Sequence, residues 1–87
     1  MSVSVIIPTK NEIDAIKQIL PQVNKDWADE WIVIDGNSND GTVEEAERLG
    51  FKVIRQKGDG LGAAYREAVQ NASCKNILFF SPDGNAL

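Results

Sequence analysis

The chain has 87 residues, of which 43% are hydrophobic and 25% are charged, and its formal net charge is −4. This length suits one small domain, and the acidic balance argues against a nucleic-acid partner, which would require a basic face. Histidine is absent and Cys74 is the single cysteine, which excludes imidazole catalysis, a disulfide framework and a cysteine metal cluster. No apolar run approaches the roughly 20 residues of a membrane span and no signal-peptide pattern opens the chain, so we expect a cytoplasmic protein.

A strand followed by a helix is predicted at the start of the chain. Residues 3–7 form a β-rich run that a proline stops, and the loop Pro8–Glu12 follows. Apolar residues then recur at helical spacing, at Ile13, Ile16, Ile19, Leu20 and Val23. Pro21 would remove the backbone hydrogen bond to Lys17, so we expect a kink or a restart of the helix there.

The second strand is the strongest signal in the sequence. Trp31–Ile34 is an unbroken apolar run, which indicates a strand buried on both faces, as in a parallel sheet. Asp35 ends this run and therefore falls at the carboxyl end of the strand, where open α/β sheets bind ligands. Asp40 or Thr42 can cap the helix that follows, at about residues 43–49.

The rest of the chain completes an alternating pattern. It predicts a strand at 51–55, a flexible glycine loop at 56–62, a helix at 63–72, a strand at 76–80 and a turn at 81–85. The order β-α-β-α-β-α-β with right-handed crossovers predicts an α/β fold, a Rossmann-like parallel sheet with helices on both faces. Such a sheet gathers polar groups on one rim, namely Asn11, Glu12, Asp35, the Gly58–Gly62 loop and Asp83.

This rim has the chemistry of a phosphate and metal site. Asp35 and Asp83 each end an apolar strand, and magnesium commonly takes one or two carboxylates together with phosphate oxygens. Backbone amides of the Gly58–Gly62 loop can approach phosphates. An acid in an ordinary turn and a plain glycine loop are the alternatives, and the spacing alone does not separate them.

Four segments resemble motifs of the family 2 glycosyltransferases. They are Val5–Glu12, Val33–Thr42, Gly60–Tyr65 and Phe79–Gly84, in the family's order and spacing over nearly the whole chain. The Gly-Leu-Gly-Ala-Ala-Tyr element looks most like the dolichyl-phosphate mannose synthase branch.

The resemblance implies that residues 1–87 are the N-terminal, donor-binding half of a GT-A fold. The whole enzyme would transfer sugar from a UDP- or GDP-sugar to an acceptor, with Mg²⁺ or Mn²⁺ on the diphosphate, and a polyprenyl phosphate is one lipid-phosphate acceptor that this branch implies. The acceptor pocket and the catalytic residues would lie beyond Leu87. We therefore expect the 87 residues alone to be inactive in transfer.

Site residues follow from the resemblance, motif by motif. Pro8, Asn11 and Glu12 would line the nucleoside pocket, and Asp35 would hold the base or the ribose. Asp83 would take the second, metal-binding position of the family's Asp-x-Asp motif.

The sequence departs from the family pattern at three positions. Ser81 stands at the first acid of the Asp-x-Asp motif, where it can still bind a ribose hydroxyl but adds no charge, so weaker metal binding is expected. Gly36 replaces a second acid found in many relatives. Lys10 stands where the mannose synthase branch often has tyrosine, which leaves the base preference open.

Other functions stay open beside the transferase. A nucleotide-binding module without transfer chemistry is favoured by Ser81. In a dinucleotide-binding oxidoreductase the glycine fingerprint follows the first strand, whereas here the glycine loop follows the third. A purely structural fragment leaves the four motifs unexplained.

The fourth strand predicts self-association. The family's usual strand arrangement places it beside the first strand, at an open edge of the sheet. Ile77–Phe80 is apolar and has no lysine or proline that would block pairing, so we expect a homo-oligomer formed through this edge or the helix face beside it.

Overall fold

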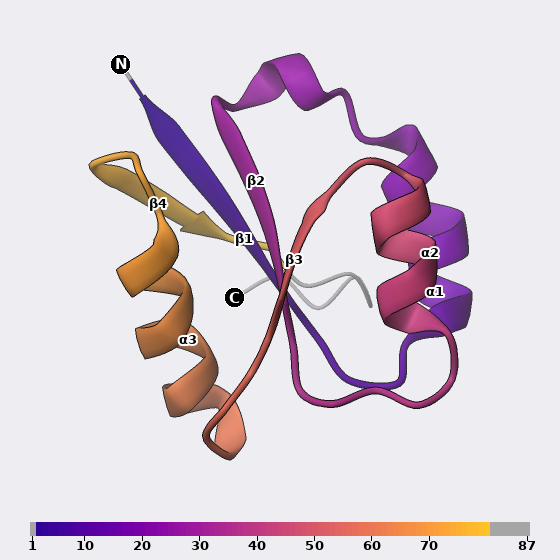
Figure 1. Cartoon of the computed structure of the whole chain (residues 1–87). Helices are drawn as coiled ribbons and strands as arrows, with labels where there is room; N and C mark the ends of the chain where they lie inside the picture. Colours follow the sequence, from indigo (N-terminus) through magenta and orange to yellow (C-terminus); the bar gives the residue numbers. More distant parts are fainter. Residues whose placement is uncertain (1, 81–87) are drawn as a thin grey trace.

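The structure, a computed structural model, describes residues 2–80 and shows one parallel sheet between two layers of helices (Figure 1). The strands are β1 (Val3–Thr9), β2 (Glu30–Asp35), β3 (Lys52–Arg55) and β4 (Asn76–Phe79). They lie in the order β3-β2-β1-β4, with every neighbouring pair parallel. The predicted α/β class and the predicted place of β4 beside β1 are confirmed.

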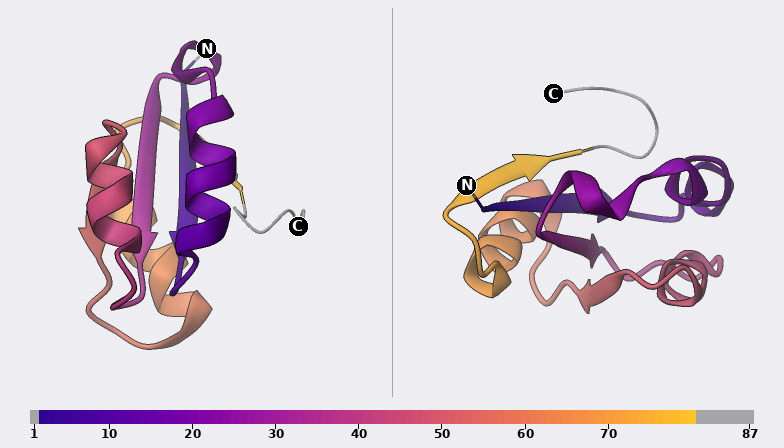
Figure 2. Two further views of the ribbon diagram at one scale, coloured as in Figure 1. Left: turned by 90° about the vertical axis from the view of Figure 1, so that its right-hand side faces the viewer. Right: turned by 90° about the horizontal axis from the view of Figure 1, so that it is seen from above.

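The helices divide between the two faces of the sheet. The helices α1 (Ile13–Ile19) and α2 (Thr42–Arg48) cover one face, and α3 (Gly60–Asn71) covers the other (Figures 1 and 2). The prediction for Pro21 is confirmed, because α1 ends at Ile19 and a 3₁₀ turn, η1 (Leu20–Gln22), continues from it. A second 3₁₀ turn, η2 (Lys25–Trp27), leads into β2. Within residues 2–80 no helix has the length and apolar character needed to cross a membrane.

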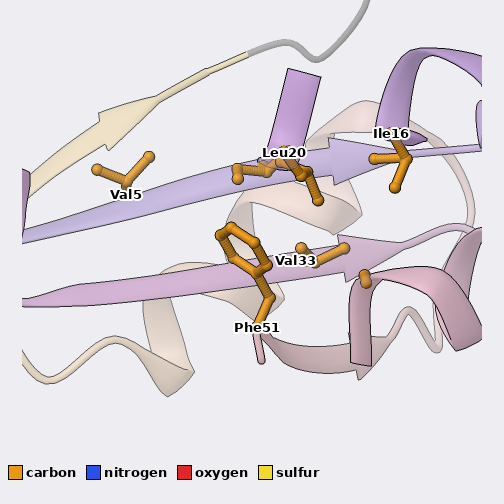
Figure 3. Packing of buried hydrophobic residues seen from close by; sticks show 7 residues of the cluster. Val5, Ile16, Leu20, Val33 and Phe51 are labelled. Atoms are coloured by element: carbon orange, nitrogen blue, oxygen red, sulfur yellow. The ribbon is translucent and has the colours of Figure 1, made fainter. Parts of the chain in front are cut away.

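Alternating side chains of β1 and β2 build a core on each face of the sheet. One core joins the two strands to α1, η1 and α2 (Figure 3); its buried members are Val5, Ile7, Ile16, Leu20, Val33, Ala46 and Phe51. The other core joins Ile6, Ile32 and Ile34 to α3. On that helix only small residues, Ala64 and Ala68, are buried against these three, which lets the helix lie close to the sheet. Burial on both faces explains why β2 reads as a continuous apolar run.

The outer edge at β4 is apolar and partly open. Ile77 and Phe79 pack toward α3, and the Phe79 ring lies 4.3 Å from that of Tyr65 between centroids. Leu78 is 58% exposed and Phe80 is 37% exposed. These two border an apolar groove on the opposite face, whose other lining residues are Val3, Val5, Val23, Trp27 and Trp31. The edge that the sequence predicts is therefore present.

Candidate functional site

A cavity of about 550 Å³ opens at the carboxyl ends of the strands. Its walls come from the ends of β1 and β2, the segment after β3 and the first turns of α3. Apolar contributions from Pro8, Ile34, Ala64 and Tyr65 lie beside polar ones from the loops. This combination of a mostly apolar wall with a few polar groups is typical of small-molecule sites.

Asp35 is buried beneath the loops that border the cavity. Its exposed fraction is 0%, and its carboxylate accepts three hydrogen bonds. The Thr9 hydroxyl donates to Oδ1 over 2.6 Å. The Ser38 hydroxyl also donates to Oδ1 over 2.6 Å, and the Ser38 backbone N–H donates to Oδ2 over 2.7 Å. Thr9 and Asp35 are register partners in the β1–β2 ladder, which brings the two side chains together. A buried carboxylate needs such donors, and here they tie the end of β1 to the turn after β2.

A set of side-chain bonds locks the loop after β1 to the loop after β2. The Asn11 N–H donates to the Ser38 hydroxyl over 2.7 Å, and the Asn39 N–H donates to the Asn11 side-chain oxygen over 2.8 Å. The Glu12 N–H donates to the Thr42 hydroxyl over 3.1 Å. Asn11 takes a left-handed backbone conformation, with φ of 50°, which asparagine tolerates better than most residues. The two loops therefore form one rigid unit.

Asp40 caps both helices that begin at these loops. Its carboxylate accepts from the Thr42 N–H at the start of α2 over 3.0 Å and from the Ile13 N–H at the start of α1 over 3.1 Å. The bond from the Thr42 hydroxyl, followed by these backbone N–H groups, lowers the pKa of Asp40. The sequence prediction that Asp40 can cap α2 is confirmed, and its bond to α1 is an addition that the sequence did not indicate.

The predicted flexible glycine loop is wrong in its extent, because α3 begins at Gly60, inside it. Two side chains order the segment that remains. The Glu67 carboxylate accepts from the N–H groups of Lys57 and Gly58, each over 2.8 Å, and the Gln56 amide donates to the carbonyls of Gly58 and Gly60, each over 2.8 Å. The bond from the Lys57 N–H, then that from Gly58, lowers the pKa of Glu67. The glycines thus sit in a fixed turn that forms one wall of the cavity.

The residues predicted for the site do not all reach the cavity. Pro8 and Glu12 line it, whereas Asn11 and Asp35 hold the loops from outside it. Ser81 and Asp83 lie outside the described residues, so the structure does not place them. The roles given to these residues in nucleotide and metal binding stay predictions.

Sequence reasoning did not single out several polar residues that line the cavity, among them Thr9, Asn37 and Gln56. The position of Gln56 in the chain is a signal that it lies at the cavity. Gln56 directly follows β3, as Gly36 directly follows β2, and residues at the carboxyl ends of parallel strands share one edge. Polarity alone did not single it out, because its neighbours in the loop are also polar.

A parallel sheet with a cavity at the carboxyl ends of its strands defines the class of ligand-binding α/β domains. Residues 4–86 match the family described as glycosyl transferase family 2. The chain belongs to this family.

Individual relatives agree with this assignment. The chain is 37% identical over 84 residues to the glycosyltransferase AglJ of Haloferax volcanii, covering 95% of this chain and 28% of the relative. It is 37% identical over 68 residues to a dolichyl-phosphate hexose transferase of the same organism, covering 76% of this chain and 29% of the relative.

Solved structures share the fold. Glucosyl-3-phosphoglycerate synthase from Mycobacterium tuberculosis, with Mn²⁺, UDP and glucosyl-3-phosphoglycerate or with Mg²⁺ and UDP, superposes with a TM-score of 0.81 at 26% identity. The superposition covers 93% of this chain and 33% of that enzyme. The chain therefore spans about a third or less of the length of these proteins, and its parallel sheet has the GT-A glycosyltransferase fold.

Replacing Asp35 by asparagine is expected to lower the free energy of unfolding by about 1–3 kcal/mol, because the amide nitrogen is a donor facing other donors. Urea denaturation followed by circular dichroism measures this. The control is Asp59→Asn, an exposed acid at the cavity with no cap bond to α3, which is expected to change stability by less than about 0.5 kcal/mol. Equal stability of the two variants would contradict the structural role of Asp35.

The lowered pKa values of Asp40 and Glu67 predict a loss of stability in acid. Each carboxyl has a lower pKa folded than unfolded, so its contribution is complete above about pH 4.5 and is lost as pH falls through the folded pKa. The urea midpoint is expected to fall between about pH 5 and pH 3, and less steeply in the variant Asp40→Asn/Glu67→Gln. A midpoint with the same pH dependence in both proteins would refute the assignment.

Proposed function

We propose that this chain forms the nucleotide-sugar donor site of a glycosyltransferase. The observation that carries the proposal is the cavity, which is built from the family's own motif segments at the carboxyl edge of the sheet. Support also comes from the solved relative, which holds UDP together with Mn²⁺ or Mg²⁺. The whole protein would then transfer a sugar from a nucleoside diphosphate to an acceptor.

Some residues would contact the nucleotide directly, and others would hold the loops that surround it. Pro8, Ile34 and Tyr65 provide an apolar wall suited to the face of a base. Asp35 and Asp40 act through the loops, which they hold in place before a ligand arrives. A site ordered in advance loses less conformational entropy on binding.

A divalent metal is part of the proposal. Within residues 2–80 no cluster of three acidic, cysteine or histidine side chains is placed to hold a metal ion, so the proposed ligand is Asp83, together with the diphosphate oxygens. When bound, the ion would act as a Lewis acid on the leaving nucleoside diphosphate. Ser81 supplies no charge at the preceding motif position.

The acceptor is proposed from a relative. The dolichyl-phosphate hexose transferase of Haloferax volcanii supports a lipid phosphate as acceptor for the whole protein. The alternative is a nucleotide-binding module without transfer chemistry, which Ser81 favours. Transfer of a radiolabelled hexose from a nucleotide-sugar to a polyprenyl phosphate by the full-length protein supports the first, and UDP binding without transfer supports the second.

Calorimetry with UDP tests the donor site. Mn²⁺ is expected to tighten UDP binding by about tenfold or more, the equivalent of one hydrogen bond to a charged group, while Mn²⁺ without nucleotide binds weakly. Asp83→Ala is expected to remove the gain from Mn²⁺ but to leave metal-free UDP binding unchanged. Tight Mn²⁺ binding without nucleotide would mean that the metal ligands are other than proposed.

Self-association through β4 is a further proposal for this chain. Within residues 2–80 no strand pairs with the outer side of β4, and the side chains of Leu78 and Phe80 beside it are exposed, which favours pairing with the same strand of a second copy. Light scattering at micromolar concentration is expected to show a dimer or a larger oligomer.

The different surroundings of Phe79 and Leu78 decide which substitution tests this edge without disturbing the fold. Phe79 packs on Tyr65, so a charge at Phe79 would disturb the core, whereas Leu78 faces outward. Leu78→Lys is therefore expected to give a monomer with an unchanged circular dichroism spectrum. A wild-type monomer would contradict the proposal.

A further inference from the structure

Gln56 holds its side-chain amide in one orientation at the wall of the cavity. The residue is 8% exposed, and its amide nitrogen donates one hydrogen to the Gly58 carbonyl and the other to the Gly60 carbonyl. A flipped amide would place its oxygen against both carbonyl oxygens, so only one orientation satisfies the turn. The position of Oε1 is therefore fixed before any ligand binds.

The Oε1 atom faces the space left by the missing side chain of Gly36. A Cβ atom added to Gly36 would lie 3.5 Å from Oε1, and both residues line the cavity. Among residues 2–80 no N–H or O–H group donates to Oε1. The cavity thus contains a fixed hydrogen-bond acceptor.

Lys10 places a donor beside the same space. Its Cδ atom would lie 3.4 Å from the added Cβ, and its ammonium donates to the Gly36 carbonyl over 2.7 Å. An ammonium has three hydrogens, so two remain for a ligand. Lys10 and Gln56 therefore present a donor and an acceptor next to Gly36.

We propose that Lys10 and Gln56 read the lactam edge of the nucleobase, which makes them specificity-determining residues of the donor site. This inference rests on the proposed function. In uracil and in guanine a carbonyl oxygen lies next to a ring N–H, so that Lys10 donates to the carbonyl and Gln56 Oε1 accepts from the ring N–H. Cytosine and adenine carry the reverse arrangement, an amino group next to a ring nitrogen that accepts.

The hydrogen-bonding groups of cytosine do not match those of Lys10 and Gln56, and this mismatch predicts which nucleotides bind more tightly. Cytosine would set its N3 lone pair against Oε1 and its amino group against the ammonium. Oε1 of the buried Gln56 would then have no partner, which costs more than a good pair gains. The site would therefore select uridine or guanosine diphosphates over cytidine or adenosine diphosphates. UDP and CDP differ only at this edge, so their affinity ratio isolates the contact.

Isothermal titration of the protein with UDP and with CDP, in the presence of Mn²⁺, tests the proposal. The wild type is expected to bind UDP about tenfold or more tightly than CDP. Gln56→Leu is expected to bring the ratio close to one. Gln56→Glu keeps an acceptor but sets a carboxylate against the Gly58 and Gly60 carbonyls, so both affinities fall while the preference for UDP persists. If the substitutions only displaced the turn, both variants would bind UDP and CDP more weakly, and the ratio of the two affinities would stay at its wild-type value.

A pair of substitutions to alanine, one inside the cavity and one outside it, tests the space at Gly36. In Gly36→Ala the new methyl group meets Lys10, Gln56 and the Thr9 carbonyl at 3.4–3.6 Å, so the fold accommodates it but the space for the base edge is filled. UDP affinity is expected to fall at least about fivefold in this variant. Gln70→Ala, at an exposed position on α3 outside the cavity wall, is expected to bind UDP like the wild type.

The outcomes separate the two proposals. A wild type that binds neither nucleotide overturns the proposed donor site itself. A wild type that binds UDP and CDP equally, or a ratio that Gln56→Leu leaves unchanged, overturns the reading of the base edge and leaves the donor site in place.

Discussion

The buried carboxylate of Asp35 is the interaction on which the rest of this site depends. A carboxylate without exposure is stable only if donors surround it, and the donors here come from β1 and from the turn after β2. Ser38, one of these donors, in turn accepts from the backbone of Asn11. One charge therefore organises two loops that are far apart in the sequence, and with them the cavity positions Lys10 and Gly36.

A second set of contacts does the same for the opposite wall. Gln56 and Glu67 approach the turn before α3 from its two sides, one through carbonyl groups and the other through N–H groups. The two sets meet at Gln56, whose backbone N–H donates to the Asp35 carbonyl over 2.7 Å and whose carbonyl accepts from the Asn37 amide over 3.5 Å. The cavity thus lies between two ordered units that these bonds and the sheet hold together.

The sequence predicted the fold more fully than the site. Hydrophobic pattern and turn residues were enough for the four strands, the kink at Pro21 and the cap at Asp40, because each depends on neighbours in the chain. The site depends on which side chains face inward at the ends of strands. The sequence predicted that Asp35 holds a ligand because acids at strand ends often do, and this contact stays a prediction. What the sequence did not indicate is the bond from the register partner Thr9, which helps to hold Asp35 beneath the loops. The position of Gln56 directly after β3 was its one signal, and its polarity did not distinguish it from its neighbours, because its role comes from contacts that only the folded turn creates.

The positions of the two tryptophans determine what fluorescence can report in this protein. Trp27 and Trp31 lie at the amino end of β2, beside the apolar groove, whereas the cavity opens at the other end of the same strand. The indole of Trp31 donates to the Lys25 carbonyl, and its ring packs edge-on against Phe51. Indole emission therefore follows the integrity of the core and the state of the open edge, and a ligand in the cavity would not touch either indole. A change in emission on adding a nucleotide would instead show that a structural change at the cavity extends along β2 to the amino end of the strand.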